Sequence, residues 1–177
     1  NDLPSVISSM VRMFADDVKI YRSLTEANNH ERLQNDLHEL QGWSVKYEMK
    51  FNPKKCQILH LGRTNSVHQY QICNEPIEHN SLIKDLGVQI SGNLHFSDHI
   101  QAQVTKANRM LGMIRRSFEY LDSDTLIWLY KALVRPHLEY ASSVWSPHRR
   151  KYIAALENVH AVKGHKADPW FYPRIAI

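Results

Sequence analysis

The stretch that decides the fold is Met13-Phe14-Ala15-Asp16-Asp17, where two adjacent aspartates follow an apolar run. Apolar residues precede it at Val11 and resume after it at Val18, in alternation with polar ones. This pattern predicts a strand, a tight turn and a second strand over residues 11–21. We therefore expect both carboxylates at the tip of a hairpin.

The adjacent carboxylates of Asp16 and Asp17 repel each other and are costly to bury unless a cation neutralises them. Oxygen ligands on a rigid turn suit Mg²⁺, which binds through a few carboxylates together with substrate phosphates. We therefore interpret Asp16 and Asp17 as metal ligands that form half of a two-metal site for phosphoryl transfer. The alternative is an ordinary solvated turn, although such a turn does not need an apolar strand on each side.

Composition and charge place the chain among soluble globular proteins. Of its 177 residues, 43% are hydrophobic and 23% are charged, as is typical of that class. The net charge of +4 is compatible with a polyanionic partner but does not require one. Because no apolar stretch could span a membrane and no signal peptide is visible, we expect an intracellular protein of the cytoplasm or nucleus, neither secreted nor membrane-bound. Cys56 and Cys73 are expected to be reduced, partly buried thiols.

The first part of the chain, residues 1–95, is predicted to be a mixed α+β domain. After the hairpin, apolar residues recur at helical spacing at Leu33, Leu37, Leu40 and Tyr47. Short strands follow, one of them over residues 82–90, with Gly87 interpreted as a bulge. This order of hairpin, helix and strands is typical of an α+β fold.

From Phe96 onward the apolar period becomes helical, which predicts an all-helical domain over residues 96–162. Helices are expected to begin at four positions: Ser97, Ser123, Pro136 and Ser146. Trp43, Trp128 and Trp145 lie on apolar stripes and are expected in the core. Residues 163–177 show no helical period and form a divergent tail.

Several motifs occur along the chain in one register up to about residue 162. They are Asn1-Asp2-Leu3-Pro4, Phe14-Ala15-Asp16-Asp17, Leu40-Gln41-Gly42-Trp43, Met49-Lys50-Phe51-Asn52-Pro53-Lys54-Lys55-Cys56, Lys84-Asp85-Leu86-Gly87-Val88, Lys106-Ala107-Asn108-Arg109, Leu129-Tyr130-Lys131-Ala132-Leu133-Val134-Arg135-Pro136-His137-Leu138-Glu139-Tyr140 and Val144-Trp145-Ser146-Pro147. In this order they resemble the reverse transcriptase of non-LTR, LINE-like retrotransposons. The resemblance implies an RNA-directed DNA polymerase fragment: a partial palm, with an antiparallel hairpin plus helix, followed by an all-helical thumb.

The same resemblance implies roles for individual residues. Asp16 is the metal-binding aspartate, with Asp17 beside it, and Lys55 protonates or neutralises the leaving pyrophosphate. Leu86 and Gly87 match the primer grip, where a glycine lets the backbone approach the primer. Lys55 could instead be part of a solvated lysine pair, and Gly87 could be a plain bulge.

Basic clusters in the helical part are candidates for nucleic-acid binding. They are Arg115-Arg116, Arg135 and His148-Arg149-Arg150-Lys151, and the candidate contacts among them are Arg115, Arg116, Arg149, Arg150 and Lys151. In a thumb they would follow the phosphates of an RNA–DNA hybrid, although such charges are often only solvated faces. The implied partners are an RNA template, a DNA primer and deoxynucleotides, and the implied cofactor of the complete enzyme is Mg²⁺.

The resemblance does not extend to the fingers or to the family's first metal-binding aspartate, which lie upstream in that family. We therefore expect the chain to be inactive alone, so whether it is an enzyme is left open. Exposure of a palm sheet edge predicts marginal stability or self-association. The alternatives are a degenerate or domesticated nucleic-acid-binding module without catalysis, and a relic with no function.

Overall fold

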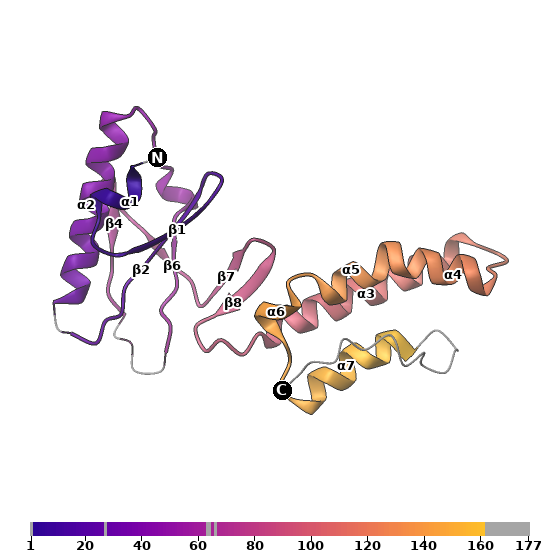
Figure 1. The fold of residues 1–177 in the computed structure, drawn as a ribbon. Coiled ribbons are helices and arrows are strands. Elements are labelled where there is room, and N and C mark those ends of the chain that lie inside the picture. Colours follow the sequence, from indigo (N-terminus) through magenta and orange to yellow (C-terminus); the bar gives the residue numbers. More distant parts are fainter. Residues whose placement is uncertain (1, 27, 63–64, 66, 162–177) are drawn as a thin grey trace. The chain divides into compact units, whose positions relative to one another are not determined.

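The computed structural model describes residues 2–26, 28–62, 65 and 67–161 (Figure 1). Its contacts divide the chain into two compact units, Asn1–Ile83 and Lys84–Ile177, which are described separately. The sequence pattern predicts a domain boundary near residue 95, whereas the division by contacts falls between residues 83 and 84. The predicted tail at residues 163–177 lies outside the described part of the chain.

The first unit contains helices and short strands, in agreement with the predicted α+β class. In order they are α1 (Leu3–Val6), β1 (Met10–Phe14), β2 (Asp17–Tyr21), α2 (Asn29–Lys46), the 3-10 helix η1 (Pro53–Lys55), β3 (Gln57–Ile58), β4 (Gln71–Ile72), β5 (Glu75–Pro76) and β6 (Glu78–His79). The β1–β2 and β4–β5 pairs are antiparallel, and the β3–β6 pair is parallel. The predicted hairpin over residues 11–21 is confirmed.

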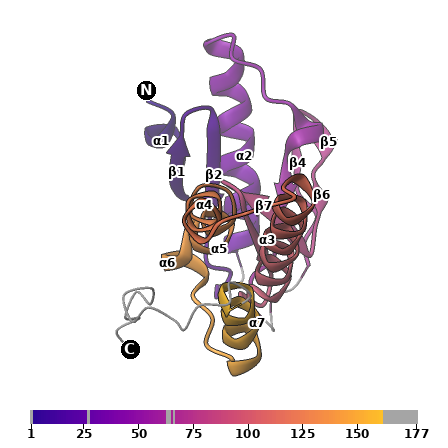
Figure 2. The same cartoon turned by 90° about the vertical axis from the view of Figure 1, so that its right-hand side faces the viewer.

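The hairpin β1–β2 has one face in the core and one in solvent. In its register Val11 pairs with Ile20, and Met13 pairs with Val18. These four side chains pack on the core of the first unit, whose buried members include Leu37, Leu40 and Trp43 of α2. Figure 2 shows the hairpin beside α2. Burial of one apolar side chain contributes about 2 kcal/mol. The packing of the apolar face of the hairpin against this core therefore fixes the orientation of the hairpin on α2.

The start of the chain is attached to the same helix. Leu3 is buried in this core. The carboxylate of Asp2 accepts hydrogen bonds from Trp43 Nε1 at 2.9 Å and from the hydroxyl of Tyr47 at 2.6 Å. These hydrogen bonds hold the pKa of Asp2 below its ordinary value. Two of the motifs that carried the resemblance are therefore in direct contact.

The second unit is mostly helical. The strand β7 (Leu82–Asp85) begins at the end of the first unit and ends in the second. The second unit then contains β8 (Val88–Ser91), α3 (Ser97–Ser117), α4 (Ser123–Leu129), the π-helical segment η2 (Tyr130–Val134), α5 (Arg135–Glu139), α6 (Ser142–Trp145) and α7 (Arg150–Ala161). The prediction of one strand over residues 82–90 is wrong, because a turn at residues 86–87 separates β7 from β8. The helix expected from Ser146 begins at Arg150 instead.

The predicted apolar stripe of α3 is confirmed. Its buried positions lie in one core with residues of the following helices; the core comprises Val88, Ile100, Val104, Ala107, Leu111, Ile114, Tyr130, Val134, Leu138, Trp145 and Val159. The prediction that Trp128 is a core residue is wrong, since it is 71% exposed. Tyr130 faces the core. Trp128 precedes it by two positions and therefore lies about 200° around the helix from it, on the solvent side. Among the described helices, none combines the length and the apolar character needed to cross a membrane.

Candidate metal and nucleic-acid site

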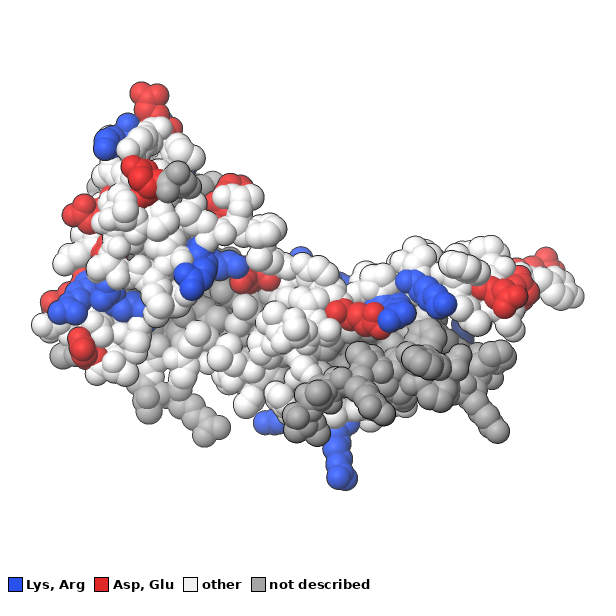
Figure 3. Space-filling view, viewed as in Figure 1, with Lys and Arg blue, Asp and Glu red and all other residues white. Residues whose placement is uncertain are grey.

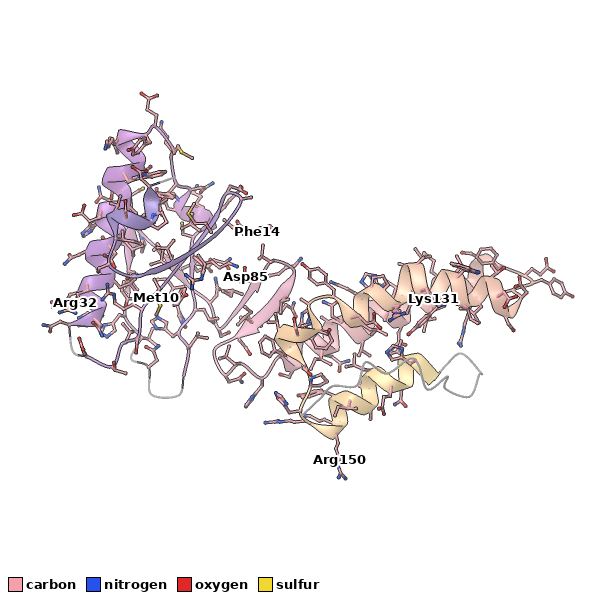
Figure 4. All side chains as sticks on the ribbon, viewed as in Figure 1. Met10, Phe14, Arg32, Asp85, Lys131 and Arg150 are labelled. Carbon is pink, nitrogen blue, oxygen red and sulfur yellow. The ribbon has the colours of Figure 1, made fainter. Side chains whose placement is uncertain are left out.

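The two aspartates lie at the tip of the hairpin, as predicted. Ala15 and Asp16 form a two-residue turn, and Asp17 begins β2 opposite Phe14. Figure 4 shows Phe14 at the end of β1 next to this turn. Ala15 has φ +53°, a left-handed conformation that costs an L-residue about 1–2 kcal/mol. Such strain often occurs at functional sites, and here it presents two exposed carboxylates on a tight turn.

The base of the hairpin is closed by a buried carboxylate from α2. Asp36 accepts hydrogen bonds from the backbone amides of Ser8 at 2.9 Å and Ser9 at 2.8 Å. The hydroxyl of Ser9 also donates to Asp36. Arg22, which follows β2, forms an ion pair with Asp36 at 3.1 Å and donates to Ser9 Oγ at 2.9 Å. We call Ser8, Ser9, Arg22 and Asp36 the basal cluster.

The basal cluster holds Asp36 in its charged form. Burial by itself raises the pKa of Asp36, but hydrogen bonds from Ser9, Ser8 and Arg22 outweigh burial and leave the pKa below its ordinary value. Sequence reasoning missed this group. The available signal was an aspartate on the apolar face of a helix, next to Leu37 and one turn before Leu40.

Lys55 lies in the same unit as the aspartate pair and is exposed. It ends η1, whose first turn is capped by Asn52 through a 3.1 Å hydrogen bond from the amide of Lys54. Cys56 follows and packs against the same core as the inner face of the hairpin. The local fold thus explains Asn52 as a cap and places Lys55 in solvent, where both of its proposed roles stay open.

Leu86 and Gly87 form the turn between β7 and β8. Their φ angles are +43° and +87°, the pair of positive values that a type I′ turn requires. Gly87 therefore serves a turn and is not a bulge within a strand. The turn belongs to the second unit, and Leu86 is 40% exposed.

The five candidate contacts are all exposed, whereas Arg135 is half-buried and forms an ion pair with Glu139 at 2.6 Å. Arg115 and Arg116 lie in the last turn of α3, where cations stabilise a helix through its dipole. Arg150 and Lys151 begin α7, where the dipole disfavours positive charge. Stabilisation of the helix therefore accounts for the first pair and not for the second.

The start of α7 presents its cations outward. Arg149 precedes the helix, and Figure 4 shows Arg150 extending away from it. Lys151 Nζ lies 4.7 Å from the ring centroid of Tyr152. On the face shown in Figure 3, positive and negative side chains are interspersed within each unit. Any attraction for a polyanion at this face therefore comes from small groups of cations and not from a broad basic surface.

The ligand atoms at the tip of the hairpin are of the type that Mg²⁺ prefers. Asp16 and Asp17 offer hard carboxylate oxygens, and Mg²⁺ is commonly held by one or two carboxylates with water and phosphates. Within the described ranges, no group of three or more His, Cys, Asp or Glu side chains is placed to hold a metal ion. The pair therefore supplies part of a coordination shell.

No family model matches this chain, and no solved structure matches it. Two curated proteins are similar to it, each an RNA-directed DNA polymerase from the mobile element jockey. The one from Drosophila funebris is 26% identical over 175 residues, and the one from Drosophila melanogaster is 25% identical over 172 residues. Each alignment covers 92% of this chain and 18% of the relative. The similarity supports a relationship to LINE-like reverse transcriptases.

Proposed function

We propose that this chain supplies the catalytic hairpin of the palm, and the thumb, of a reverse transcriptase that copies RNA into DNA. The observation that carries the proposal is the exposed pair Asp16 and Asp17 on a strained two-residue turn. The similarity to two jockey polymerases over nearly the whole chain supports it. The partners would be an RNA template, a DNA primer and a deoxynucleotide.

In this proposal Asp16 and Asp17 bind the metal through their carboxylate oxygens. Bound Mg²⁺ supplies activation of the primer hydroxyl and neutralisation of charge on the phosphates. Lys55 contributes an ammonium group, which can donate a proton to a departing pyrophosphate. The basal cluster keeps the hairpin in place, because its hydrogen bonds join the segments before β1 and after β2 to α2.

We also propose that the chain alone does not polymerise. Two adjacent carboxylates offer too few ligands to hold two Mg²⁺ ions in the geometry of in-line displacement. A further carboxylate would have to come from another segment of the polymerase. The chain would then contribute one part of a composite site.

The test is nucleotide incorporation on a primed RNA template with Mg²⁺. The 177-residue chain is compared with a longer version that carries the upstream part of the palm. We expect incorporation only by the longer version, and we expect Asp16→Asn to abolish it. Asp98→Asn, an exposed aspartate in the first turn of α3, is the matched control and should retain incorporation. Incorporation by the longer version that persists in Asp16→Asn would refute the proposal.

A second candidate function is nucleic-acid binding without catalysis. It is favoured by the exposed cations at the start of α7, which the helix dipole does not explain. If this function is correct, the chain binds an RNA–DNA hybrid, Arg150→Glu weakens that binding, and the longer version incorporates no nucleotide. Retention of hybrid binding in Arg150→Glu would contradict the binding role of this cluster.

A further inference from the structure

Tyr140, at the end of α5, is in direct contact with the turn between β7 and β8. Its hydroxyl donates a 2.8 Å hydrogen bond to the carbonyl oxygen of Leu86. A Cβ placed on Gly87 would lie 3.1 Å from Cε1 of the Tyr140 ring. The positive φ favours glycine at position 87, and the close approach of this ring leaves little room for a Cβ there.

Tyr140 is also fixed through its backbone. Its carbonyl oxygen accepts a 2.7 Å hydrogen bond from Nε1 of Trp145, which is only 2% exposed. The Trp145 ring meets the buried His99 ring edge-on, with 5.2 Å between centroids. Nδ1 of His99 in turn accepts a 3.2 Å hydrogen bond from the amide of Gln89 in β8. The hairpin is thus held at its tip and on its second strand by one connected group.

Burial does not explain the position of Tyr140. Although held at its hydroxyl and its carbonyl, the residue is 57% exposed, and Leu86 beside it is 40% exposed. An aromatic residue whose role is core packing would be buried, as Tyr130 is in the same unit. The ring of Tyr140 instead covers the glycine backbone and leaves much of its surface open to solvent next to the turn.

We propose that Tyr140 positions the turn at residues 86–87 against the primer strand and contacts that strand with its open ring face. The inference rests on the proposed function and on the interpretation of Leu86 and Gly87 as a primer contact, which the resemblance to reverse transcriptases implies. A glycine lets a nucleic-acid backbone approach closely. An aromatic face beside it can pack on a base or sugar without regard to sequence. Rigidity matters because a turn fixed before binding has less conformational entropy to lose.

The experiment measures binding of the 177-residue chain to a DNA primer annealed to an RNA template, by fluorescence anisotropy and by hydroxyl-radical footprinting of each strand. Tyr140→Leu removes the ring and should weaken binding about tenfold. Tyr140→Phe keeps the ring but loses the hydrogen bond to Leu86; it should weaken binding about fivefold or less and speed amide exchange at the turn. Tyr120→Leu is the control, because Tyr120 is 92% exposed in the same unit, and it should bind as the wild type does.

The footprints separate positioning from general stability. The inference predicts that both Tyr140 variants lose protection of the primer strand near its 3′ end and keep protection of the template strand, with unchanged unfolding midpoints. Equal loss on both strands, or loss that follows the unfolding midpoint, would overturn it. Wild-type binding retained in Tyr140→Leu would also overturn it while leaving the proposed function intact. Absence of hybrid binding by the wild-type chain would overturn this inference, whereas the proposed function is decided separately by nucleotide incorporation in the longer version.

Discussion

The basal cluster gives the sharpest test of how the hairpin is held. The side chains of Asp36 and Arg22 are 8% and 13% exposed, so their ion pair is buried. Loss of one member of a buried pair costs about 3–5 kcal/mol, because the other charge is left without a partner. Asparagine keeps one acceptor oxygen for the amides of Ser8 and Ser9, which places Asp36→Asn at the lower end, about 3 kcal/mol.

The assay is amide exchange of the β1 and β2 amides, followed by mass spectrometry, because it reports the free energy of opening of this hairpin alone. The control is Glu26→Gln, which removes an exposed ion pair between Glu26 and Arg32 at 3.7 Å. That pair is solvent-screened and should contribute less than about 0.5 kcal/mol. If Asp36→Asn changes the opening free energy no more than this control does, the reasoning is wrong.

The basal cluster also predicts a pH dependence. Because the pKa of Asp36 is lower in the folded state than its ordinary value of 3.8, its stabilising contribution is fully present at neutral pH. That contribution is lost as pH falls below the ordinary value and through the folded-state pKa. The hairpin amides of the wild type should therefore lose more protection in this acidic range than those of Asp36→Asn. Parallel pH curves for the two proteins would contradict the assignment.

Three further predictions concern the turn, the tryptophans and the basic cluster. Ala15→Gly should raise the free energy of unfolding in urea by about 1 kcal/mol by relieving the left-handed strain, and destabilisation would refute that reason. Trp145→Ala should cost about 3–5 kcal/mol in the same assay and Trp128→Ala less than about 0.5 kcal/mol, because the first is 2% and the second 71% exposed. Arg150→Ala should reduce the slope of hybrid affinity against salt by about 1, and an unchanged slope would exclude a phosphate contact there.

Local patterns in the sequence predicted the elements that depend on local burial. Alternation around Asp16 and Asp17 predicted the hairpin, because the side chains of a strand alternate between core and solvent. The helical stripe from Ile100 to Ile114 predicted α3 for the corresponding reason. The same patterns misplaced Trp128, because an apolar residue within a helix does not by itself reveal which side faces the core.

The motifs that carry the resemblance lie far apart in the sequence, yet in the structure some of them are in direct contact. Asp2 accepts a hydrogen bond from Trp43, and Tyr140 donates one to Leu86. Each pair is separated by more than forty residues. The order of the motifs along the chain indicated the resemblance, but it could not show which motifs are in contact in the folded structure.

The sequence by itself determined the acidic hairpin and the apolar stripe of α3, because each depends on neighbours within a few residues. Only the tertiary structure decided that Asp36 closes the base of the hairpin and that the Tyr140 ring covers Gly87. Both contacts join segments far apart in the chain. Whether these two contacts form depends on how the helices and strands of each unit pack together. That packing is determined by burial of the apolar core of each unit.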